Sequence, residues 1–301
     1  MRYGLQARTG GLVGLPMSSL RVAGRVAGLS AALAVSGVPA PSAAQPAQAT
    51  ASTITYADLA DLADPSTVVV RAKVKDAIVV PPERAATALP GHARLYIEAT
   101  TSALLAGNAP LGEALRYLVD VPLDEQGKVP KLKKREFVLF ARTVDGRPGE
   151  LQLVGPTAQL PYDIALEGRL KPILGELVAA DRPPVVTGVR DALSVPGALV
   201  GESETQMFLS TRSGDPVSVT VIRRPGMSPA WGVSFSEIVD QAARPPERET
   251  LAWYRLACFL PAQLPAAANL AQDAPSRARA VQDYRFVIDQ LGPCPRTLRA
   301  G

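Results

Sequence analysis

No catalytic signature stands out in this chain, and its weak candidates for catalysis are two acidic residues, Glu202 and Glu204. They flank Ser203 in the segment GESETQ, ahead of an apolar stretch. On an extended chain they would share one face about 7 Å apart, since each residue rises roughly 3.3 Å. Glycosidases that use two carboxylates separate them by about 5 to 9.5 Å. The spacing permits acid–base hydrolysis, but catalytic carboxylates normally face each other across a cleft, so we favour a turn and strand edge.

A cluster of basic residues offers a second kind of site, one that would bind anions. The segment KVPKLKKRE carries Lys131, Lys133, Lys134 and Arg135 directly before the apolar stretch FVLFA. Such a cluster can hold phosphate, lipid headgroups or an anionic polysaccharide. Charges beside an aggregation-prone strand also keep an exposed edge from pairing with another chain. We favour this protective role and keep anion binding as the alternative.

The sequence contains few of the residues that would bind a cofactor or a metal ion. His92, in the loop PGHAR, is the one histidine, so a Ser-His-Asp or Cys-His nucleophile would have to use it. No serine lies in a Gly-x-Ser-x-Gly elbow and no Gly-rich phosphate loop occurs. Neither histidine-based metal sites nor EF-hand calcium loops fit the sequence. We therefore expect no cofactor, no metal and a solvated loop position for His92.

The two cysteines, Cys258 and Cys294, predict a disulfide. They form no Cys-x-x-Cys pair and no zinc signature, and an even number of cysteines in an exported protein indicates a structural bridge. The bridge would close a loop of about 37 residues, for which chain entropy predicts roughly 4 kcal/mol of stabilisation.

Residues 55–162 predict a small antiparallel β-barrel. Thr55 is the expected N-cap of a short helix that ends before Pro65. From Val70 onward the next segment alternates apolar and basic residues, which is typical of a half-buried strand. Turn residues separate the strands, which are predicted at 66–80, 94–101, 115–121, 136–144 and 150–154. The long first strand favours an OB-like barrel, but no helix is predicted between the third and fourth strands, so an SH3-like barrel remains open.

Residues 163–301 predict an α+β domain with a helix pair. Its expected elements are helices at 164–178, 245–260 and 276–292 and strands at 205–211, 217–223 and 231–235. Pro172 is expected to kink or split the first of these helices. Gly214 lies at the tip of a hairpin, and the disulfide joins the ends of the last two helices. The apolar face of the last helix is formed by Val281, Tyr284, Val287, Ile288 and Leu291.

Three segments of this half carry a resemblance to other proteins: GESETQ at 201–206, AWYRLACFLP at 252–261 and DYRFVIDQLGPCPR at 283–296. With them the chain resembles a group of uncharacterised secreted bacterial proteins over most of its mature length. The aromatic residues of the second segment are expected in the core, beside the disulfide. The group has no assigned activity, so the resemblance implies bacterial export and a common fold, and it transfers no site residues.

Residues 1–44 have the layout of a secretory signal peptide. Four Arg and no acidic residue occur in this segment, and small residues follow its apolar run at 26–35. A run of about ten residues is too short for a membrane-spanning helix, which needs roughly 20. We expect cleavage between Ala44 and Gln45, with Met17 as the candidate start and 45–54 as a disordered leader.

Cleavage makes the mature chain formally neutral. Of 32 Lys plus Arg and 28 Asp plus Glu, four basic residues and no acid lie before Gln45, so the mature chain carries 28 of each sign. The basic pI therefore belongs to the targeting peptide and is no argument for nucleic-acid binding. We expect a non-catalytic binding or assembly module of the periplasm or extracellular space, without a transmembrane segment in the mature chain. Its partner would be an envelope protein or polysaccharide, and the alternative is a carboxylate-dependent hydrolase of envelope glycan or peptide.

Native mass spectrometry of the protein from its own cell-envelope fraction tests export. The expected mass corresponds to a chain that begins at Gln45 and has lost two hydrogens to the disulfide, because both changes accompany passage into an oxidising compartment. A full-length mass with free thiols would contradict the export hypothesis.

Overall fold

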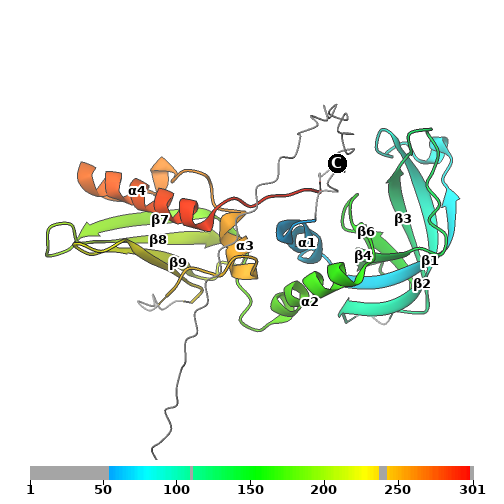
Figure 1. Ribbon diagram of the computed structural model, residues 1–301, viewed down its shortest axis with the longest axis horizontal. Helices are drawn as coiled ribbons and strands as arrows, with labels where there is room; N and C mark the ends of the chain where they lie inside the picture. The colour runs from blue at the N-terminus through cyan, green and yellow to red at the C-terminus, as the bar shows by residue number, and fades with distance from the viewer. Residues whose placement is uncertain (1–53, 109–110, 237–242, 299–301) are drawn as a thin grey trace, which may run out of the picture. The chain divides into compact units, whose positions relative to one another are not determined.

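The computed structural model describes residues 54–108, 111–236 and 243–298, which form a mixed α+β structure (Figure 1). The predicted signal peptide, 1–44, and residues 45–53 of the predicted leader lie outside the described residues. Four α-helices occur in the described part: α1 (Tyr56–Ala63), α2 (Ile164–Val178), α3 (Leu251–Ala257) and α4 (Ala274–Leu291). It also contains two short 3-10 helices, η1 (Pro82–Arg84) and η2 (Ala266–Ala268).

A closed five-stranded barrel forms the first sheet. Its strands are β1 (Val68–Val79), β2 (His92–Gly107), β3 (Ala114–Pro122), β4 (Glu136–Thr143) and β5 (Glu150–Leu153), and β6 (Gln159–Pro161) adds to β4. The strand order is β1-β2-β3-β5-β4, and pairing of β1 with β4 closes the barrel. The predicted barrel is confirmed, but β3 and β5 pair in parallel, whereas the other neighbours are antiparallel. The parallel pair arises because β4 lies between β1 and β5, so β5 has to fill the place beside β3.

The alternation predicted along β1 is confirmed. Val70, Ala72 and Val74 are buried inside the barrel, and Lys73 and Lys75 are exposed. Register shifts in the ladder with β2 bend the strand, as bulges do, which helps one strand to pair on both of its edges. The barrel interior is filled mainly by large apolar side chains, among them Leu95, Ile97, Leu115, Tyr117, Val119, Phe137, Leu139 and Leu151.

A second, four-stranded antiparallel sheet follows in the order β10-β9-β8-β7. Its strands are β7 (Val186–Pro196), β8 (Ser203–Thr211), β9 (Val217–Arg223) and β10 (Ala230–Ser234). The predicted hairpin of β8 and β9 and the third strand, β10, are confirmed. The sequence pattern does not predict β7, because Gly188 and two register shifts against β8 interrupt its alternation.

Side-chain caps decide where the helices begin. At α1 the predicted N-cap is confirmed, since Thr55 and Asp58 form a reciprocal capping box. The predicted start of the third helix at Pro245 is wrong, because Thr250 caps α3 by accepting a hydrogen bond from the Trp253 backbone. No helix in the described ranges is long and apolar enough to cross a membrane.

Two details of the predicted helices need correction. Helix α2 runs unbroken through Pro172, so the expected split does not occur; packing of its apolar face into the core offsets the cost of the proline. In α4, Val281 is 50% exposed and does not belong to the buried face. Its expected place is taken by Ala280 and Asp283, both of which are fully buried.

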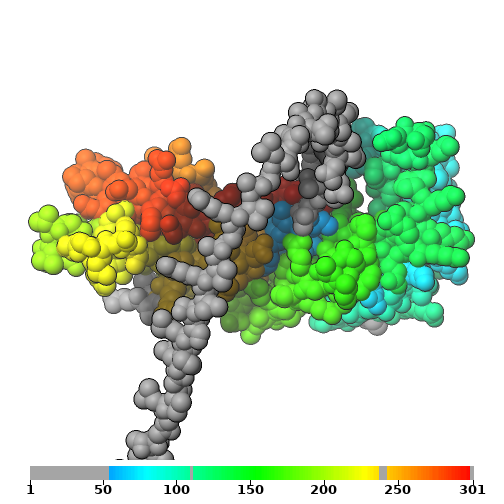
Figure 2. All heavy atoms as spheres, viewed as in Figure 1, coloured from blue at the N-terminus to red at the C-terminus, as the bar shows by residue number. Residues whose placement is uncertain are grey.

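The second core brings together α1, α2, α3, α4, one face of the second sheet and outward-facing residues of the barrel strands β1, β4 and β6. Helix α4, orange to red in Figure 2, packs on β7 and β8. Although α1 precedes the barrel in the chain, its buried residues join this core and not the barrel interior. The predicted core position of the aromatic segment is confirmed, with Trp253 and Tyr254 buried and Phe259 packed against them. The larger members include Leu59, Phe140, Leu170, Ile173, Met207, Val221, Leu251, Tyr284 and Val287.

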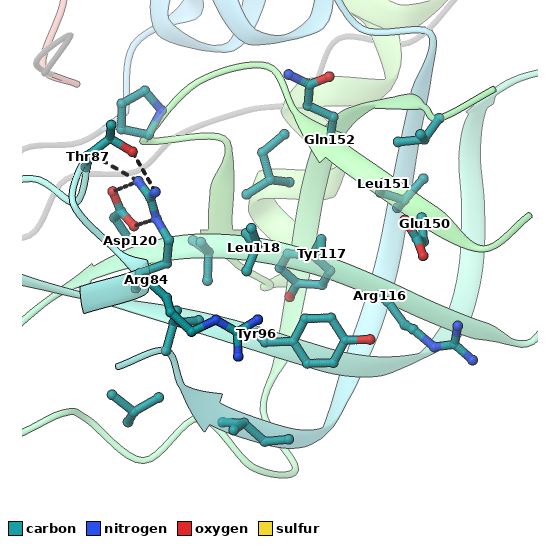
Figure 3. A pocket seen from close by; sticks show the side chains of 18 of the residues that line it. Arg84, Thr87, Tyr96, Arg116, Tyr117, Leu118, Asp120, Glu150, Leu151 and Gln152 are labelled. Carbon is teal, nitrogen blue, oxygen red and sulfur yellow. Dashed lines mark hydrogen bonds and ion pairs between the residues drawn. The ribbon is translucent and has the colours of Figure 1, made fainter. Parts of the chain in front are cut away.

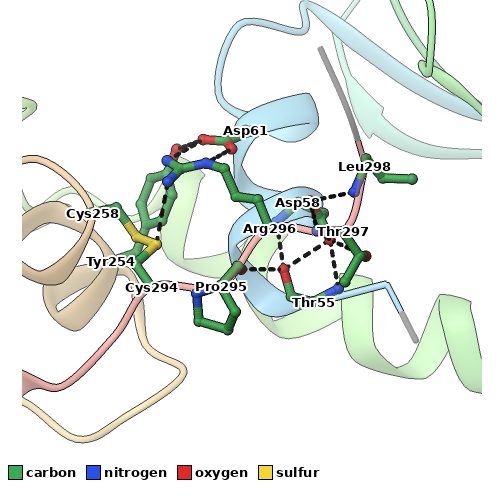
Figure 4. Close-up of polar contacts among 10 residues, drawn as sticks. All are labelled: Thr55, Asp58, Asp61, Tyr254, Cys258, Cys294, Pro295, Arg296, Thr297 and Leu298. Carbon is green, nitrogen blue, oxygen red and sulfur yellow. Dashed lines mark hydrogen bonds and ion pairs between the residues drawn. A yellow bond between two sulfur atoms is a disulfide. The ribbon is translucent and has the colours of Figure 1, made fainter. Parts of the chain in front are cut away.

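The residues after α4 form a C-terminal clasp, defined here as Cys294–Leu298, that binds to α1 (Figure 4). The predicted disulfide between Cys258 and Cys294 is confirmed and joins the end of α3 to the clasp. Asp58, only 2% exposed, accepts hydrogen bonds from the backbone N–H groups of Thr297 and Leu298, at 3.0 Å each, and from the Thr297 hydroxyl at 2.7 Å. The clasp thus ties residues 294–298 to α1.

The substitution Asp58→Asn should release the clasp from α1. Burial acts to raise the pKa of Asp58, but hydrogen bonds from Thr55, Thr297 and Leu298 outweigh it and lower the pKa below its ordinary 3.8. A lowered carboxyl pKa contributes stability that is present above the unfolded value and is lost as the pH falls through the folded value. We expect chemical denaturation at neutral pH to show a loss of about 1 to 3 kcal/mol, and a weaker fall in stability below about pH 4.

Asp289→Asn is the matched control, since Asp289 lies on the exposed side of α4 and pairs with Arg285 at 4.0 Å. Its stability should change by less than about 0.5 kcal/mol. Equal effects of the two variants would contradict the role assigned to Asp58.

Candidate functional site

A hollow of about 1000 Å³ lies on the outer face of the barrel and is called the barrel hollow here (Figure 3). Strands β2, β3 and β5 and the end of β1 form its base. Two loops border it: residues 80–91, which include η1, connect β1 to β2, and residues 144–149 connect β4 to β5. The barrel hollow is therefore assembled from several strands and loops that lie side by side only when the strands pair.

Strand alternation determines which side chains face the barrel hollow. On β3 the buried Tyr117 and Val119 point into the barrel, so Arg116, Leu118 and Asp120 point outward. On β2, Tyr96 pairs directly with Leu118, and Arg94 pairs with Asp120. Directly opposed residues of antiparallel strands have neighbouring side chains, and these two pairs build the middle of the base.

An ion pair anchors the loop 80–91 to the base. The Arg94 guanidinium donates to both carboxylate oxygens of Asp120, at 2.7 and 2.8 Å. It also donates to the hydroxyl and the carbonyl oxygen of Thr87, at 2.7 and 3.0 Å. Asp120 accepts a further hydrogen bond from the Leu89 backbone at 3.3 Å. Strand side chains thus hold the loop in place before any ligand arrives.

The same contacts keep Asp120 ionised. Its hydrogen bond from Arg94, together with the Leu89 contact and the charge of Arg94, lowers the pKa of Asp120 despite partial burial. The pKa of Arg94 is raised by the same hydrogen bond. Asp120 is therefore a structural anion and not a proton donor at neutral pH.

Two arginines at the barrel hollow have no ion-pair partner among the described residues. Arg84, on η1, and Arg116, on β3, are both exposed. Arg147, in contrast, pairs with Glu150 at 3.2 Å. With Arg94 neutralised by Asp120, the barrel hollow keeps two uncompensated positive charges, which favour a ligand that carries negative charge.

Part of the base of the barrel hollow consists of accessible apolar side chains. Ile78 and Val79, at the end of β1, and Leu118 on β3 are 51%, 50% and 51% exposed. Contiguous exposed apolar side chains with a polar border are typical of sites that bind another protein or a ligand. Apolar contact and positive charge are thus available to the same ligand.

The carboxyl groups with a displaced pKa do not support acid–base catalysis. In the described residues all four such groups shift downward: Asp58 and Asp120, as explained, Glu167 through its hydrogen bond from Lys171, and Asp273 through the Ser276 backbone. A general acid at neutral pH needs a raised carboxyl pKa. These four carboxyl groups are therefore ionised at neutral pH and do not act as general acids there.

The predicted carboxylate pair lies elsewhere, at the start of β8. Glu202 accepts a hydrogen bond from the Leu199 backbone at 3.2 Å, and Glu204 accepts one from the Gln206 side chain at 2.7 Å. Neither residue borders the barrel hollow. The two carboxylates remain weak candidates, each held by its own local partner.

The predicted basic residues lie between β3 and β4 and do not line the barrel hollow. Leu132 inserts into the barrel core, while Lys131, Lys133, Lys134 and Arg135 around it stay exposed. Lys133 lies 3.7 Å from the carboxylate of Asp76. The backbones of Lys134 and Arg135 pair with Val74 of β1, so the segment extends the ladder at that edge.

His92 lies at the start of β2, where one ring nitrogen is 2.9 Å from the Pro90 carbonyl oxygen. It does not line the barrel hollow. Within the described ranges, no three His, Cys, Asp or Glu residues are grouped as a metal site would require.

The sequence patterns missed the residues that the barrel hollow displays. Tyr96, Arg116 and Leu118 lie within strands that were predicted, at outward-facing positions. The available signal was an apolar or aromatic residue on the solvent face of two neighbouring strands, where polar residues are usual. The sequence does not mark Arg84 as a site residue. Its position at the barrel hollow depends on which strands its loop lies against, and that is known only from the fold.

Asp120→Asn should loosen the loop 80–91 while the barrel stays folded. The variant keeps the size of the side chain but loses the charge that binds Arg94. Hydrogen–deuterium exchange should speed up at the loop amides, Leu89 among them, and remain slow in the buried strands. Glu150→Gln is the control, because its ion pair with Arg147 is exposed and local. Unchanged exchange at the loop would contradict the anchoring role.

In comparisons with known proteins, no protein-family model and no curated protein matches the chain.

Proposed function

We propose that this protein is an exported, non-catalytic binding or assembly module whose barrel hollow holds an extended segment of a partner protein. The observation that carries the proposal is the barrel hollow itself, with its accessible apolar base and two uncompensated arginines. The partner segment would carry apolar side chains against Leu118 and acidic side chains toward Arg84 and Arg116.

An OB-like barrel is the fold type that fits this site best. OB folds are five-stranded Greek-key barrels that bind their ligands on the β2–β3 face, between the β1–β2 and β4–β5 loops. The barrel hollow occupies the equivalent positions in this chain. The helix usual between the third and fourth strands is replaced by the segment around Leu132, which fills the barrel from that side. The likeness in fold carries no ligand with it.

Export to the bacterial periplasm or medium is the second part of the proposal. The layout of residues 1–44 predicts it, as does the resemblance to secreted bacterial proteins. The disulfide between Cys258 and Cys294 is compatible with an oxidising compartment. We place the domain boundary at 162/163, between the barrel and the α+β part, with α1 completing the second core.

The alternative is a hydrolase that uses Glu202 and Glu204. Each of these carboxylates is held by its own local partner, the Leu199 backbone for Glu202 and the Gln206 side chain for Glu204, whereas a catalytic pair faces one substrate across a cleft. A flat or hollow apolar surface, in contrast, favours a binding partner.

Titration with short peptides tests the function, because the proposed ligand chemistry can be built into a probe. A peptide of alternating Val and Glu should bind, and one of alternating Val and Lys should not. Arg84→Glu combined with Arg116→Glu should weaken binding about tenfold or more, because both charges change sign. Leu118→Ser should weaken it as well, since it removes apolar contact.

Reversal of Lys131, Lys133 and Lys134 to Glu provides the matched control, because it changes exposed charges outside the barrel hollow. If this triple variant loses binding and the Arg84/Arg116 variant keeps it, the anion site is the basic segment and the proposal is wrong. If alginate oligomers bind and the peptides do not, the partner is an acidic polysaccharide and not a protein. Binding of no probe would overturn the barrel hollow as a site.

A further inference from the structure

A second, smaller hollow lies at one end of the second sheet, remote in sequence from the barrel, and is called the sheet-end pocket here. Its volume is about 490 Å³. The loop 197–202, between β7 and β8, forms one wall, and the start of β8, the end of β9 and helix α4 form the rest. Ser203, Arg223 and Arg279 contribute its hydrogen-bond donors, and Glu202 is the acidic residue among its walls.

Two of these donors are buried without a partner. The Ser203 side chain is 3% exposed, and its hydroxyl makes no hydrogen bond with the protein. One terminal nitrogen of the Arg279 guanidinium, Nη1, is also buried without a partner. Leaving a buried polar group unpaired costs about 1 to 3 kcal/mol, and more for a charged group. Two such donors lining one pocket indicate that their acceptor comes from outside the chain.

The third donor, Arg223, is held in a fixed position. Its guanidinium donates to Asp283 on α4 at 2.6 Å, and Asp283 is fully buried. The other oxygen of Asp283 accepts a hydrogen bond from the Thr205 hydroxyl at 2.5 Å. Ser203 and Arg223 are direct partners in the β8–β9 ladder, so this contact places the cation beside the unpaired hydroxyl.

From this geometry we propose that the sheet-end pocket binds a small oxyanion group, hydrogen-bonded by Ser203 and Arg279 beside the cation of Arg223. Guanidinium and hydroxyl groups are the donors that carboxylates and phosphates accept best. The pocket uses none of the residues of the barrel hollow, so it is a separate site and does not depend on the proposed function.

The charge balance of the sheet-end pocket selects the kind of oxyanion. Asp283 neutralises Arg223, and the Glu202 carboxylate adds a negative charge at the wall. Glu202 is held there by the Leu199 backbone, and Gly197 allows its close approach, since a Cβ at that position would meet Glu202 at 2.3 to 2.6 Å. A ligand with one negative charge is repelled less by Glu202 than a dianion. The pocket therefore suits a carboxylate better than a phosphate.

NMR titrations with acetate and with inorganic phosphate test this site on the full mature chain. We expect saturable shifts in the amides of 197–203, with acetate binding tighter than phosphate. Ser203→Ala should weaken acetate binding about tenfold or more, as expected for a hydrogen bond to a charged group. Its melting temperature without ligand should not fall, because the lost hydroxyl has no partner in the protein. Ser218→Ala is the matched control: Ser218 is another buried serine of this sheet with an unpaired hydroxyl, and it does not line the pocket.

A second pair of variants tests the charges. Arg279→Gln should abolish measurable binding, and Arg285→Gln, on the exposed side of the same helix, should leave it unchanged. Glu202→Gln should tighten phosphate binding severalfold by removing a repulsive charge. If phosphate binds more tightly than acetate, the pocket is still an oxyanion site, but the proposed preference for a carboxylate is wrong. Absence of binding by both probes, or equal affinities in the wild type, Ser203→Ala and Arg279→Gln, would overturn the proposal.

Discussion

The double pairing of β1 is the interaction on which the barrel depends. From Val68 to Lys73 the strand pairs with β4 on one edge, and along its whole length it pairs with β2 on the other. The first part is therefore enclosed on both edges, and its Val68 and Val70 fill the barrel, whereas Val69 faces the second core. Beyond Val74, whose backbone still pairs with Lys134 and Arg135, the strand loses its second neighbour. Ile78 and Val79 become exposed for this reason, and they form part of the base of the barrel hollow.

The second core depends on contacts between the two ends of the described chain. Helix α1 is too short to be stable by itself, since isolated helices shorter than about 12 residues are marginal in water. It is stabilised by its apolar face in the core and by the C-terminal clasp, which donates three hydrogen bonds to Asp58. Arg296 adds an ion pair with Asp61 at 2.5 Å, and the disulfide holds the start of the clasp on α3. The residues after α4 thus stabilise α1 within the second core.

Arginine is used in two ways in this protein, and its carboxylate partners make the difference. Asp64, Asp120 and Asp283 each bind an arginine, at 2.8, 2.7 and 2.6 Å, and turn it into a fixed structural element. In the candidate sites, arginines without such a partner lie beside these fixed pairs: Arg84 and Arg116 near Arg94, and Arg279 near Arg223. A paired arginine beside an unpaired one gives a site both rigidity and free charge, which is the arrangement that binding without large rearrangement requires.

The sequence by itself determined most of the local elements, the disulfide and the presence of a barrel, but not β7 or the start of α3. The alternation along β1 and the Thr55 cap depend on residues that are neighbours in the sequence, so they can be recognised without the fold. The disulfide could be predicted because the chain contains two cysteines. Only the tertiary structure decided that β5 lies parallel to β3, that Val281 is exposed while Asp283 is buried, and that α1 belongs to the second core. It also decided both candidate sites. Arg84 and Leu118 line one hollow only once β2 has paired with both β1 and β3, and Ser203, Arg223 and Arg279 line one pocket only once β8, β9 and α4 come together. Exposure and unpaired donors depend on which distant strands become neighbours, and no local pattern of residues contains that information.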